Sequence, residues 1–228
     1  MSDVEESELF RGLPADEAKE ARALAKRRRY APGDALFHQG DAAEGFMVLL
    51  EGRVKVAQTT ADGRETLVRF ITPGELFGCV PLLGEDRYPG TAEAVEPVTV
   101  LAWDSAATAR LLEQHPRFAT SALRVVGGRL REFQDRLQEV STERVERRLA
   151  RALLRLAHQA GRRTEDGVLI DLPITRAELA EMIGTTLYSV SRILAAWQRR
   201  GVVSTARQRI LVRQPHALVA IGEELGEP

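Results

Sequence analysis

The sequence predicts an α+β protein with three parts: an N-terminal antiparallel β-roll of the double-stranded jelly-roll type, a long helix, and a small domain of helices with a β-hairpin. Three patterns support this. Glycine-marked turns recur through residues 30–104, apolar residues recur at 3.5-residue spacing through 123–140, and two short capped helices occupy 174–200. The expected domains are 1–114, 115–141 and 142–228.

Composition limits the possible classes of protein. The 228 residues carry a formal net charge of −1, and 44% of them are hydrophobic, which suffices for two small cores. No apolar run approaches about 18 residues and the N-terminal residues are polar, so we expect neither a membrane span nor a signal peptide. The single cysteine excludes a disulfide framework within the chain. These features predict a cytoplasmic protein without membrane contact.

The first domain is expected to begin with a polar helix at about 15–25, which ends in the basic run Lys26–Arg29. From Tyr30 onward, apolar segments alternate with Pro-Gly, Gly-Asp and Asp-Gly turns, a pattern typical of an antiparallel sandwich or barrel. The expected strands are 35–38, 45–50, 54–57, 67–71 and 98–103, followed by a short helix at about 105–113.

The long helix carries an apolar seam whose members are three or four residues apart: Leu123, Val126, Leu130, Phe133, Leu137 and Val140. A spacing of 3.5 residues favours pairing with an identical helix, so we expect a parallel, two-fold homodimer. The alternative is a single helix that lies on its own domain. Ser141 and Thr142 are expected to break this helix and to recap the chain, as a hinge before a helix over 145–158.

Residues 174–200 carry the signals of two helices around a tight turn. Thr175 and Glu178 form a Thr-x-x-Glu capping box, and Gly184 is suited to end the first helix. Thr185 or Thr186 is expected to cap the second helix, whose buried face consists of Val190, Ile193, Leu194 and Trp197. This layout predicts a helix-turn-helix, which places its second helix in the major groove of DNA.

A predicted β-hairpin, called the wing below, follows these helices, and the whole segment is basic. Two short apolar segments, 201–204 and 210–212, flank a polar turn, and residues 141–213 contain 14 arginines against 7 acidic residues. The alternative is a generic helical domain with a surface hairpin. The residues expected to contact DNA are Thr175, Arg176, Thr185, Thr186, Leu187, Tyr188, Ser189, Ser191, Arg192, Arg199, Arg207 and Arg209.

This order of elements resembles the bacterial transcription regulators of the CRP/FNR family. The resemblance rests on the helix-turn-helix and on the segments 30–41, 50–56 and 73–78, and it covers about residues 9–213. It implies that an effector in the β-roll reorients two recognition helices through the dimer helix, and that the operator is an inverted repeat. RNA polymerase is an implied partner if the protein is an activator.

The recognition helix departs from the best-known members of that family. Leu187-Tyr188 replaces a pair that ends in glutamate, whereas Ser191-Arg192 matches the second half of the family pattern. Arg192 is suited to bind a guanine or a phosphate, and Leu187 offers only apolar contact, for instance to a thymine methyl. Tyr188 either takes part in base reading or stacks on the sugar-phosphate backbone. A half-site different from that of the cyclic-AMP receptor is expected.

The effector site departs further. By the resemblance, the pocket would include Phe77, Gly78, Cys79, Val80, Arg87, Tyr88, Leu130, Phe133 and Gln134. Where cyclic-AMP-binding members have a glutamate and an Arg-Ser or Arg-Thr pair, this chain has Cys79 and Tyr88-Pro89, which argues against cyclic AMP. Arg87, one position away, remains a candidate for a phosphate contact.

Other effectors stay open at this point. One cysteine argues against an iron–sulfur cluster, and haem would require axial ligands among His38, Cys79 and His115. The four histidines form no metal-binding pattern, so no metal site is expected. A pocket filled by the protein's own side chains is the further alternative.

The sequence contains no nucleophile elbow, phosphate-binding loop or metal-hydrolase motif, so we do not expect an enzyme. A different class of function is a regulatory module that binds a ligand and controls a protein partner through the C-terminal domain. Salt dependence distinguishes the two, because binding to several DNA phosphates weakens steeply as salt rises.

Overall fold

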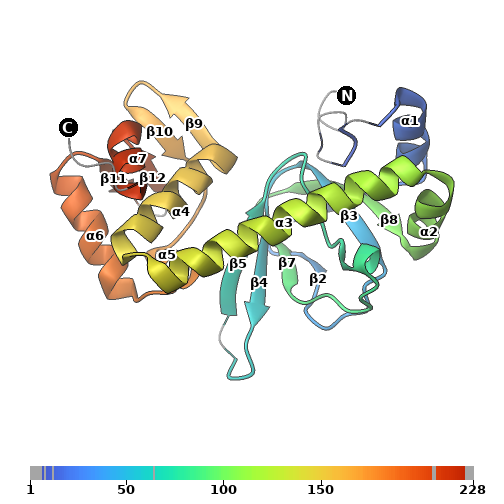
Figure 1. The fold of residues 1–228 in the computed structure, drawn as a ribbon, viewed down its shortest axis with the longest axis horizontal. Coiled ribbons are helices and arrows are strands. Elements are labelled where there is room, and N and C mark those ends of the chain that lie inside the picture. Colours follow the sequence, from blue (N-terminus) through green and yellow to red (C-terminus); the bar gives the residue numbers. More distant parts are fainter. Residues whose placement is uncertain (1–6, 8, 12, 64, 207–208, 224–228) are drawn as a thin grey trace. The chain divides into compact units, whose positions relative to one another are not determined.

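The computed structural model describes residues 7, 9–11, 13–63, 65–206 and 209–223 (Figure 1). The chain forms two compact units, residues 1–132 and 133–228, and the division falls within the long helix α3, Pro116–Thr142. Within the part that the structure describes, no helix is long and apolar enough to cross a membrane.

The first unit is built around antiparallel sheets, as the sequence predicts, and its described residues form two sheets of four strands each. The first sheet has the order β1-β8-β3-β6 and the second the order β2-β7-β4-β5. The elements of this unit before α3 are α1 Ala15–Ala23, β1 Lys26–Tyr30, β2 Ala35–Phe37, β3 Gly45–Glu51, β4 Val54–Thr59, β5 Glu65–Ile71, β6 Leu76–Phe77, the 3-10 helix η1 Val80–Leu83, β7 Thr91–Ala94, β8 Val98–Asp104 and α2 Ser105–Gln114.

Tight turns connect the strands, and one glycine shows why they need that residue. Gly52 lies between β3 and β4 with φ +85°, a left-handed conformation that favours glycine. A Cβ atom at this position would come within 2.2 Å of the Pro97 carbonyl oxygen. The Glu51-Gly52 turn is therefore fixed both by backbone conformation and by the close approach of the neighbouring chain segment.

Two cores stabilise this unit. On one side of the first sheet, Phe46 and Trp103 stack with ring centroids 4.8 Å apart, and the α3 residue Phe118 joins them. The indole Nε1 of Trp103 donates to the Ala21 carbonyl oxygen of α1 at 2.7 Å, which satisfies the only polar atom of a side chain that is 1% exposed. The second core lies between the sheets and includes Leu49, Ile71 and Val100.

Several local predictions were wrong. The basic run Lys26–Arg29 does not end a helix but belongs to strand β1, which pairs with β8 at one edge of the first sheet. An edge strand can keep its side chains in solvent, so the run lacks the apolar alternation that reveals buried strands. The strands β6 and β7 were not predicted either, because each has at most four residues and is too short to show a clear alternation.

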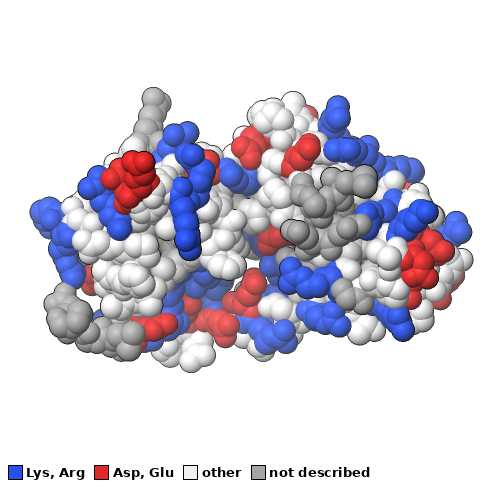
Figure 2. All heavy atoms as spheres, turned by 90° about the horizontal axis from the view of Figure 1, so that it is seen from above, with Lys and Arg blue, Asp and Glu red and all other residues white. Residues whose placement is uncertain are grey.

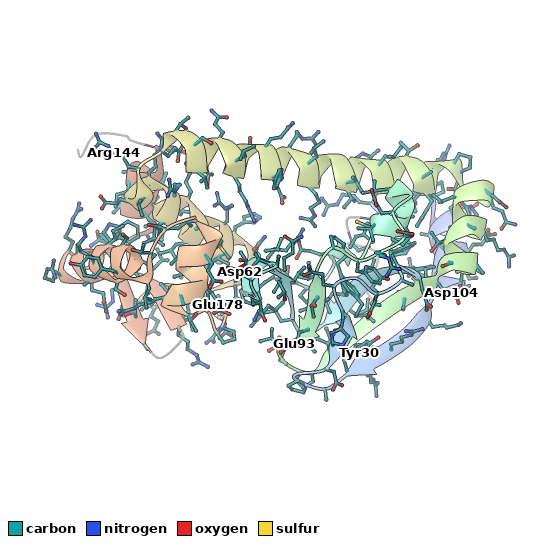
Figure 3. All side chains as sticks on the ribbon, turned by 90° about the horizontal axis from the view of Figure 1, so that it is seen from below. Tyr30, Asp62, Glu93, Asp104, Arg144 and Glu178 are labelled. Carbon is teal, nitrogen blue, oxygen red and sulfur yellow. The ribbon has the colours of Figure 1, made fainter. Side chains whose placement is uncertain are left out.

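The end of the long helix also differs from the expectation. Ser141 and Thr142 neither break α3 nor cap the next helix, because their hydroxyls donate to the Leu137 and Gln138 carbonyl oxygens one turn earlier. The break falls instead at residues 143–144, and α4, Val145–Ala160, begins after Arg144 without a side-chain cap. Arg144 is labelled at this corner in Figure 3.

The described residues of the second unit form the end of α3, four further helices and one four-stranded sheet. That sheet has the order β11-β12-β10-β9 and is antiparallel throughout. The sequence predicted β11 and β12 but neither the β9–β10 hairpin nor the last helix. The elements are α4, β9 Gly161–Thr164, β10 Gly167–Ile170, α5 Arg176–Met182, α6 Leu187–Arg199, β11 Val203–Ala206, β12 Arg209–Val212 and α7 Pro215–Glu223.

Candidate nucleic-acid interface

Helix α5 begins with the capping box that the sequence predicts. The Thr175 hydroxyl accepts from the Glu178 backbone N–H at 3.1 Å, and the Glu178 carboxylate accepts from the Thr175 backbone N–H at 2.7 Å. Glu178 is labelled at the start of this helix in Figure 3. Gly184 follows the helix with φ +64°, which turns the chain toward α6.

Helix α6 presents a polar first turn and a buried apolar face. Thr186, not Thr185, is its cap, because the Thr186 hydroxyl accepts from the Ser189 backbone N–H at 3.2 Å. The four predicted apolar residues, Val190, Ile193, Leu194 and Trp197, are all buried. The Trp197 indole donates to Glu146 on α4 at 2.9 Å, which ties α6 to the helix behind it.

The exposed surface of α6 begins with two large side chains. Leu187 is 53% and Tyr188 76% exposed, an unusual degree of exposure for two neighbouring side chains of this size and apolar character. Arg192 lies one turn further along and is also exposed, whereas Ser189 and Ser191 are half-buried. A helix with these residues outward offers apolar contact at its start and a cation beyond it.

The wing lies beside the start of α5. The Arg176 guanidinium is 3.4 Å from the Thr205 hydroxyl of β11, and a hollow of about 420 Å³ lies between α5, α6 and the β11–β12 pair. Leu187 and Arg209 also line this hollow, so four of the predicted contact residues, Thr175, Arg176, Leu187 and Arg209, meet at one place. Ala177 and Thr205 line the hollow as well. Neither was predicted as a contact residue, because neither is charged and neither belongs to a recognised motif.

The remaining predicted residues are placed as follows. Thr185 is half-buried in the turn after Gly184, and Arg199 is exposed at the end of α6. Arg207 lies outside the described residues. Of the described arginines in the predicted set, Arg192, Arg199 and Arg209 form no ion pair within the described part of the chain, and so their charges are available to an anionic partner. Figure 2 shows Lys and Arg side chains at the left edge of the view, where Figure 1 places α6.

The predicted seam of α3 is exposed along its length. Leu123 is 64%, Leu130 57%, Phe133 65%, Leu137 58% and Val140 45% exposed, whereas Val126 is half-buried. Such a row of large apolar side chains on one helix face is a candidate interface. The helix is long enough for that role, because it continues without interruption from Pro116 to Thr142.

Around Tyr88, which the resemblance assigns to an effector pocket, aromatic rings stack at the wall of a hollow of about 360 Å³. Tyr88 is 6% exposed, stacks on Phe37 with ring centroids 3.9 Å apart, and donates its hydroxyl to the Gly45 carbonyl oxygen at 2.8 Å. Burial raises the pKa of the Tyr88 phenol, so it is neutral near pH 7. A Cβ atom at Gly78 would lie 3.2 Å from the Phe37 ring and 3.4 Å from the Tyr88 ring.

The other residues predicted for the effector pocket are placed as follows. Arg87 donates to the Gly40 carbonyl oxygen at 2.6 Å and is exposed. Phe77 is buried near Phe37, and Cys79 and Val80 lie at the start of η1. Leu130, Phe133 and Gln134 are exposed on α3, and their part in an effector pocket stays a prediction.

The candidate haem ligands come from separate elements. His115 ends α2 and its Nε2 is 3.3 Å from a Glu20 carboxylate oxygen, His38 follows β2, and Cys79 precedes η1. Among the described residues, no group of three or more His, Cys, Asp or Glu side chains is suited to hold a metal ion.

Two family models match the chain, and together they cover most of it. The cyclic nucleotide-binding domain matches residues 27–115, and the Crp-like helix-turn-helix domain matches residues 147–221. The first match spans nearly all of the two sheets of the β-roll, and the second runs from the first turn of α4 into α7.

Curated relatives and solved structures agree with these models. The cyclic AMP receptor protein of Thermus thermophilus is 33% identical over 215 residues, which are 94% of this chain and 96% of that protein. The CRP-like cAMP-activated global transcriptional regulator of Mycobacterium tuberculosis is 24% identical over 92% of this chain and 94% of its own. A CRP-family transcriptional regulator from Thermus thermophilus has a structure with a TM-score of 0.72 at 26% identity, over 86% of this chain and 96% of that chain.

Proposed function

Because the chain belongs to the CRP/FNR family of transcription regulators, we propose that it acts as a homodimer on an inverted-repeat DNA operator and that cyclic AMP does not control it. Its place of action is the cytoplasm, where the DNA is, and RNA polymerase is its partner if it activates. The observation that carries the proposal is the capped helix α6, which turns Leu187, Tyr188 and Arg192 outward.

DNA contact through this helix has a physical basis. The start of α6 is free to enter a major groove, where Arg192 would bond a guanine edge and Leu187 would touch a thymine methyl. Arg176 and Arg209, at the rim of the hollow beside the wing, would bind backbone phosphates. The twelve contact residues predicted from the sequence, Arg207 among them, are proposed as this interface.

The exposed seam of α3 supports the dimer. All of its members except Val126 are exposed large apolar side chains, and burial of such a row against an identical helix removes it from water. A parallel two-fold pair would present two copies of α6 to successive major grooves about 34 Å apart. An inverted-repeat operator follows from this symmetry.

The residues at the expected phosphate contacts support independence from cyclic AMP. A cyclic phosphate requires cationic or N–H donors. At the two positions where the resemblance places the Arg-Ser or Arg-Thr pair, the chain has the neutral Tyr88 phenol, which is bonded to Gly45, and Pro89, which lacks an N–H. Arg87 is bound to Gly40. These positions therefore do not supply the phosphate contacts that cyclic AMP would need, although two relatives carry cyclic AMP in their names.

The test is the selection of operators from a random DNA library by the purified protein, with and without cyclic AMP. Enrichment of one inverted repeat in both arms is expected. Enrichment only with cyclic AMP would overturn the effector part and favour a nucleotide-dependent regulator. Absence of enrichment in both arms would favour the protein-binding alternative, and so would an affinity for the selected DNA that does not fall steeply with salt.

A further inference from the structure

One buried arginine joins the end of α3 to the turn of the helix-turn-helix. Arg148, on α4, is 8% exposed. Its Nη1 donates to the carbonyl oxygens of Val140 at 3.1 Å and Glu143 at 3.0 Å, and its Nη2 donates to the Gly184 carbonyl oxygen at 3.1 Å. A single planar group thus bonds three backbone acceptors from two segments that are far apart in the sequence.

The two sets of acceptors have different origins. The Val140 and Glu143 carbonyls lie at the end of α3, where the last carbonyls of a helix lack intrahelical partners and are favourably bound by a cation. Gly184 lies in the left-handed turn that leads to α6, which begins three residues later at Leu187. The guanidinium therefore fixes the chain on both sides of the junction between the long helix and the recognition helix.

A side-chain contact reinforces this junction. A Cβ atom at Gly184 would lie 3.5 Å from Cγ1 of Val140, so the Val140 side chain packs directly against the turn. Val140 is also the last member of the exposed seam. One residue of the proposed dimer face is therefore bonded through its carbonyl, and packed through its side chain, to the segment that aims α6.

Neighbouring arginines on α4 make a different contact. Arg147 and Arg151 donate to the Gly222 carbonyl oxygen of α7 at 2.8 and 2.9 Å, and Arg151 also pairs with Glu143 at 3.0 Å. These bonds hold α3 and α7 against α4. Both Arg148 and Arg151 bind the end of α3, but Arg148 also binds the α5–α6 turn, whereas Arg151 binds α7. Arg151 is therefore a matched control on the same helix.

We propose that Arg148 is a positioning residue that sets the angle between the dimer seam and α6, and hence the half-site spacing that the dimer accepts. The inference rests on the proposed function. In a symmetric dimer, the separation of the two recognition helices depends on how each one is fixed to the end of its α3. A loosened junction would let α6 follow half-sites at more than one spacing.

The experiment uses the operator selected by the full-length wild-type protein, together with versions that have one base pair added or removed between the half-sites. Affinities are measured for the wild type, Arg148→Met, Arg148→Lys and the control Arg151→Met, after circular dichroism and light scattering show folded dimers. The wild type and Arg151→Met are expected to lose at least about tenfold in affinity at the wrong spacing, because half-sites must meet successive grooves. Arg148→Met is expected to lose less than about threefold in affinity at the wrong spacing. Arg148→Lys should fall between the wild type and Arg148→Met, because an ammonium group keeps the charge but lacks the planar fork that bonds several carbonyls at once.

A merely structural role would lower the affinity for all spacings equally. If Arg148→Met keeps the wild-type spacing ratio, the inference is wrong, whatever the absolute affinity. If Arg148→Met does not fold, Arg148→Lys decides in the same way: an unchanged ratio overturns the inference and a reduced ratio supports it. A wild type without any spacing preference would overturn the proposed dimer on an inverted repeat, and this inference with it.

Discussion

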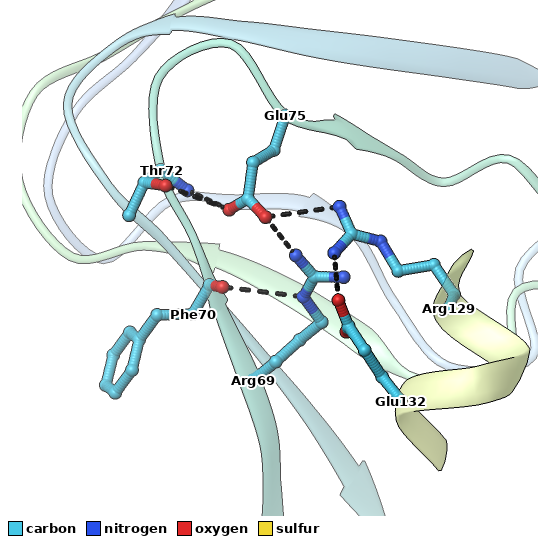
Figure 4. Close-up of polar contacts among 6 residues, drawn as sticks. All are labelled: Arg69, Phe70, Thr72, Glu75, Arg129 and Glu132. Carbon is cyan, nitrogen blue, oxygen red and sulfur yellow. Dashed lines mark hydrogen bonds and ion pairs between the residues drawn. The ribbon is translucent and has the colours of Figure 1, made fainter. Parts of the chain in front are cut away.

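Glu75 and Arg129 form a hydrogen-bonded ion pair, with 3.1 Å between a Glu75 carboxylate oxygen and Arg129 Nη2, and this bond joins the turn before β6 to α3 (Figure 4). The same carboxylate also pairs with Arg69 and accepts from the backbone N–H of Thr72 at 2.6 Å. The side chains of Glu75, Arg69 and Arg129 are 12%, 16% and 23% exposed. One carboxylate thus holds together a strand, a turn and the long helix of the first unit.

Removal of this carboxylate should destabilise the first unit. Glu75→Gln removes the anion that two mostly buried guanidiniums share, and the loss of one partner from a buried ion pair typically costs about 3 kcal/mol. Urea unfolding of the wild type and of Glu75→Gln measures the difference in the free energy of unfolding. Glu132→Gln is the control, because Glu132 is 54% exposed and lies 3.5 Å from Arg129, and its loss should cost less than about 1 kcal/mol. Equal effects of the two substitutions would contradict the importance of burial at Glu75.

Introduction of a charge into the seam should dissociate the dimer. Leu130→Asp or Leu137→Asp would place a carboxylate between two apolar helices, where it has no partner and would have to lose its water. Light scattering at micromolar concentration should give the mass of one chain. Arg131→Asp, on an exposed part of the same helix outside the seam, should remain a dimer. A dimeric Leu137→Asp protein would place the interface elsewhere.

Two arginines of α6 should differ in what their removal does. Arg192→Ala should lose about 1–3 kcal/mol of specific binding and relax the preference at one base position. Arg199→Ala, at the end of the helix, should weaken binding to all sequences alike and lower the salt slope by about 1. Binding to operator variants over a range of salt concentrations measures both. An unchanged base preference in Arg192→Ala would remove this residue from the reading set.

Alkaline pH should lower the stability of the protein through ionisation of the buried Tyr88 phenol. The pKa of Tyr88 is raised above 10.0 because the phenol is buried, so the fold favours the protonated form. This contribution to stability is fully present below about pH 10, the ordinary value, and is lost as the pH rises through the higher pKa of the folded state. Tyr88→Phe should remove that alkaline loss and, at pH 7, cost about 1 kcal/mol for the hydrogen bond to Gly45.

Unfolding by urea at a series of pH values tests this prediction. Tyr188→Phe is the control, since the Tyr188 side chain is 76% exposed to solvent, so its substitution should change stability at pH 7 by less than about 0.5 kcal/mol. An alkaline limb that is identical in the wild type and Tyr88→Phe would show that the phenol is not buried in solution.

The sequence alone determined the features that depend on local spacing. The capping box at Thr175, the left-handed Gly184, the buried face of α6 and the exposed seam of α3 all follow from side chains within one or two helical turns of each other. The glycine turns of the β-roll are likewise local, because backbone conformation restricts which residues they accept. These features sufficed for the order of elements and for the resemblance to the family.

Only the tertiary structure decided which distant groups share a bond. The edge strand β1 shows no alternation of its own, and it becomes a strand because β8 supplies the backbone partners. Tyr88 is buried because Phe37 stacks on it and Gly45 accepts its hydroxyl, and Arg148 joins Val140 to Gly184, which are far apart along the chain. No local residue pattern predicts these contacts, because each one depends on how the packed elements place their backbone carbonyls and aromatic rings.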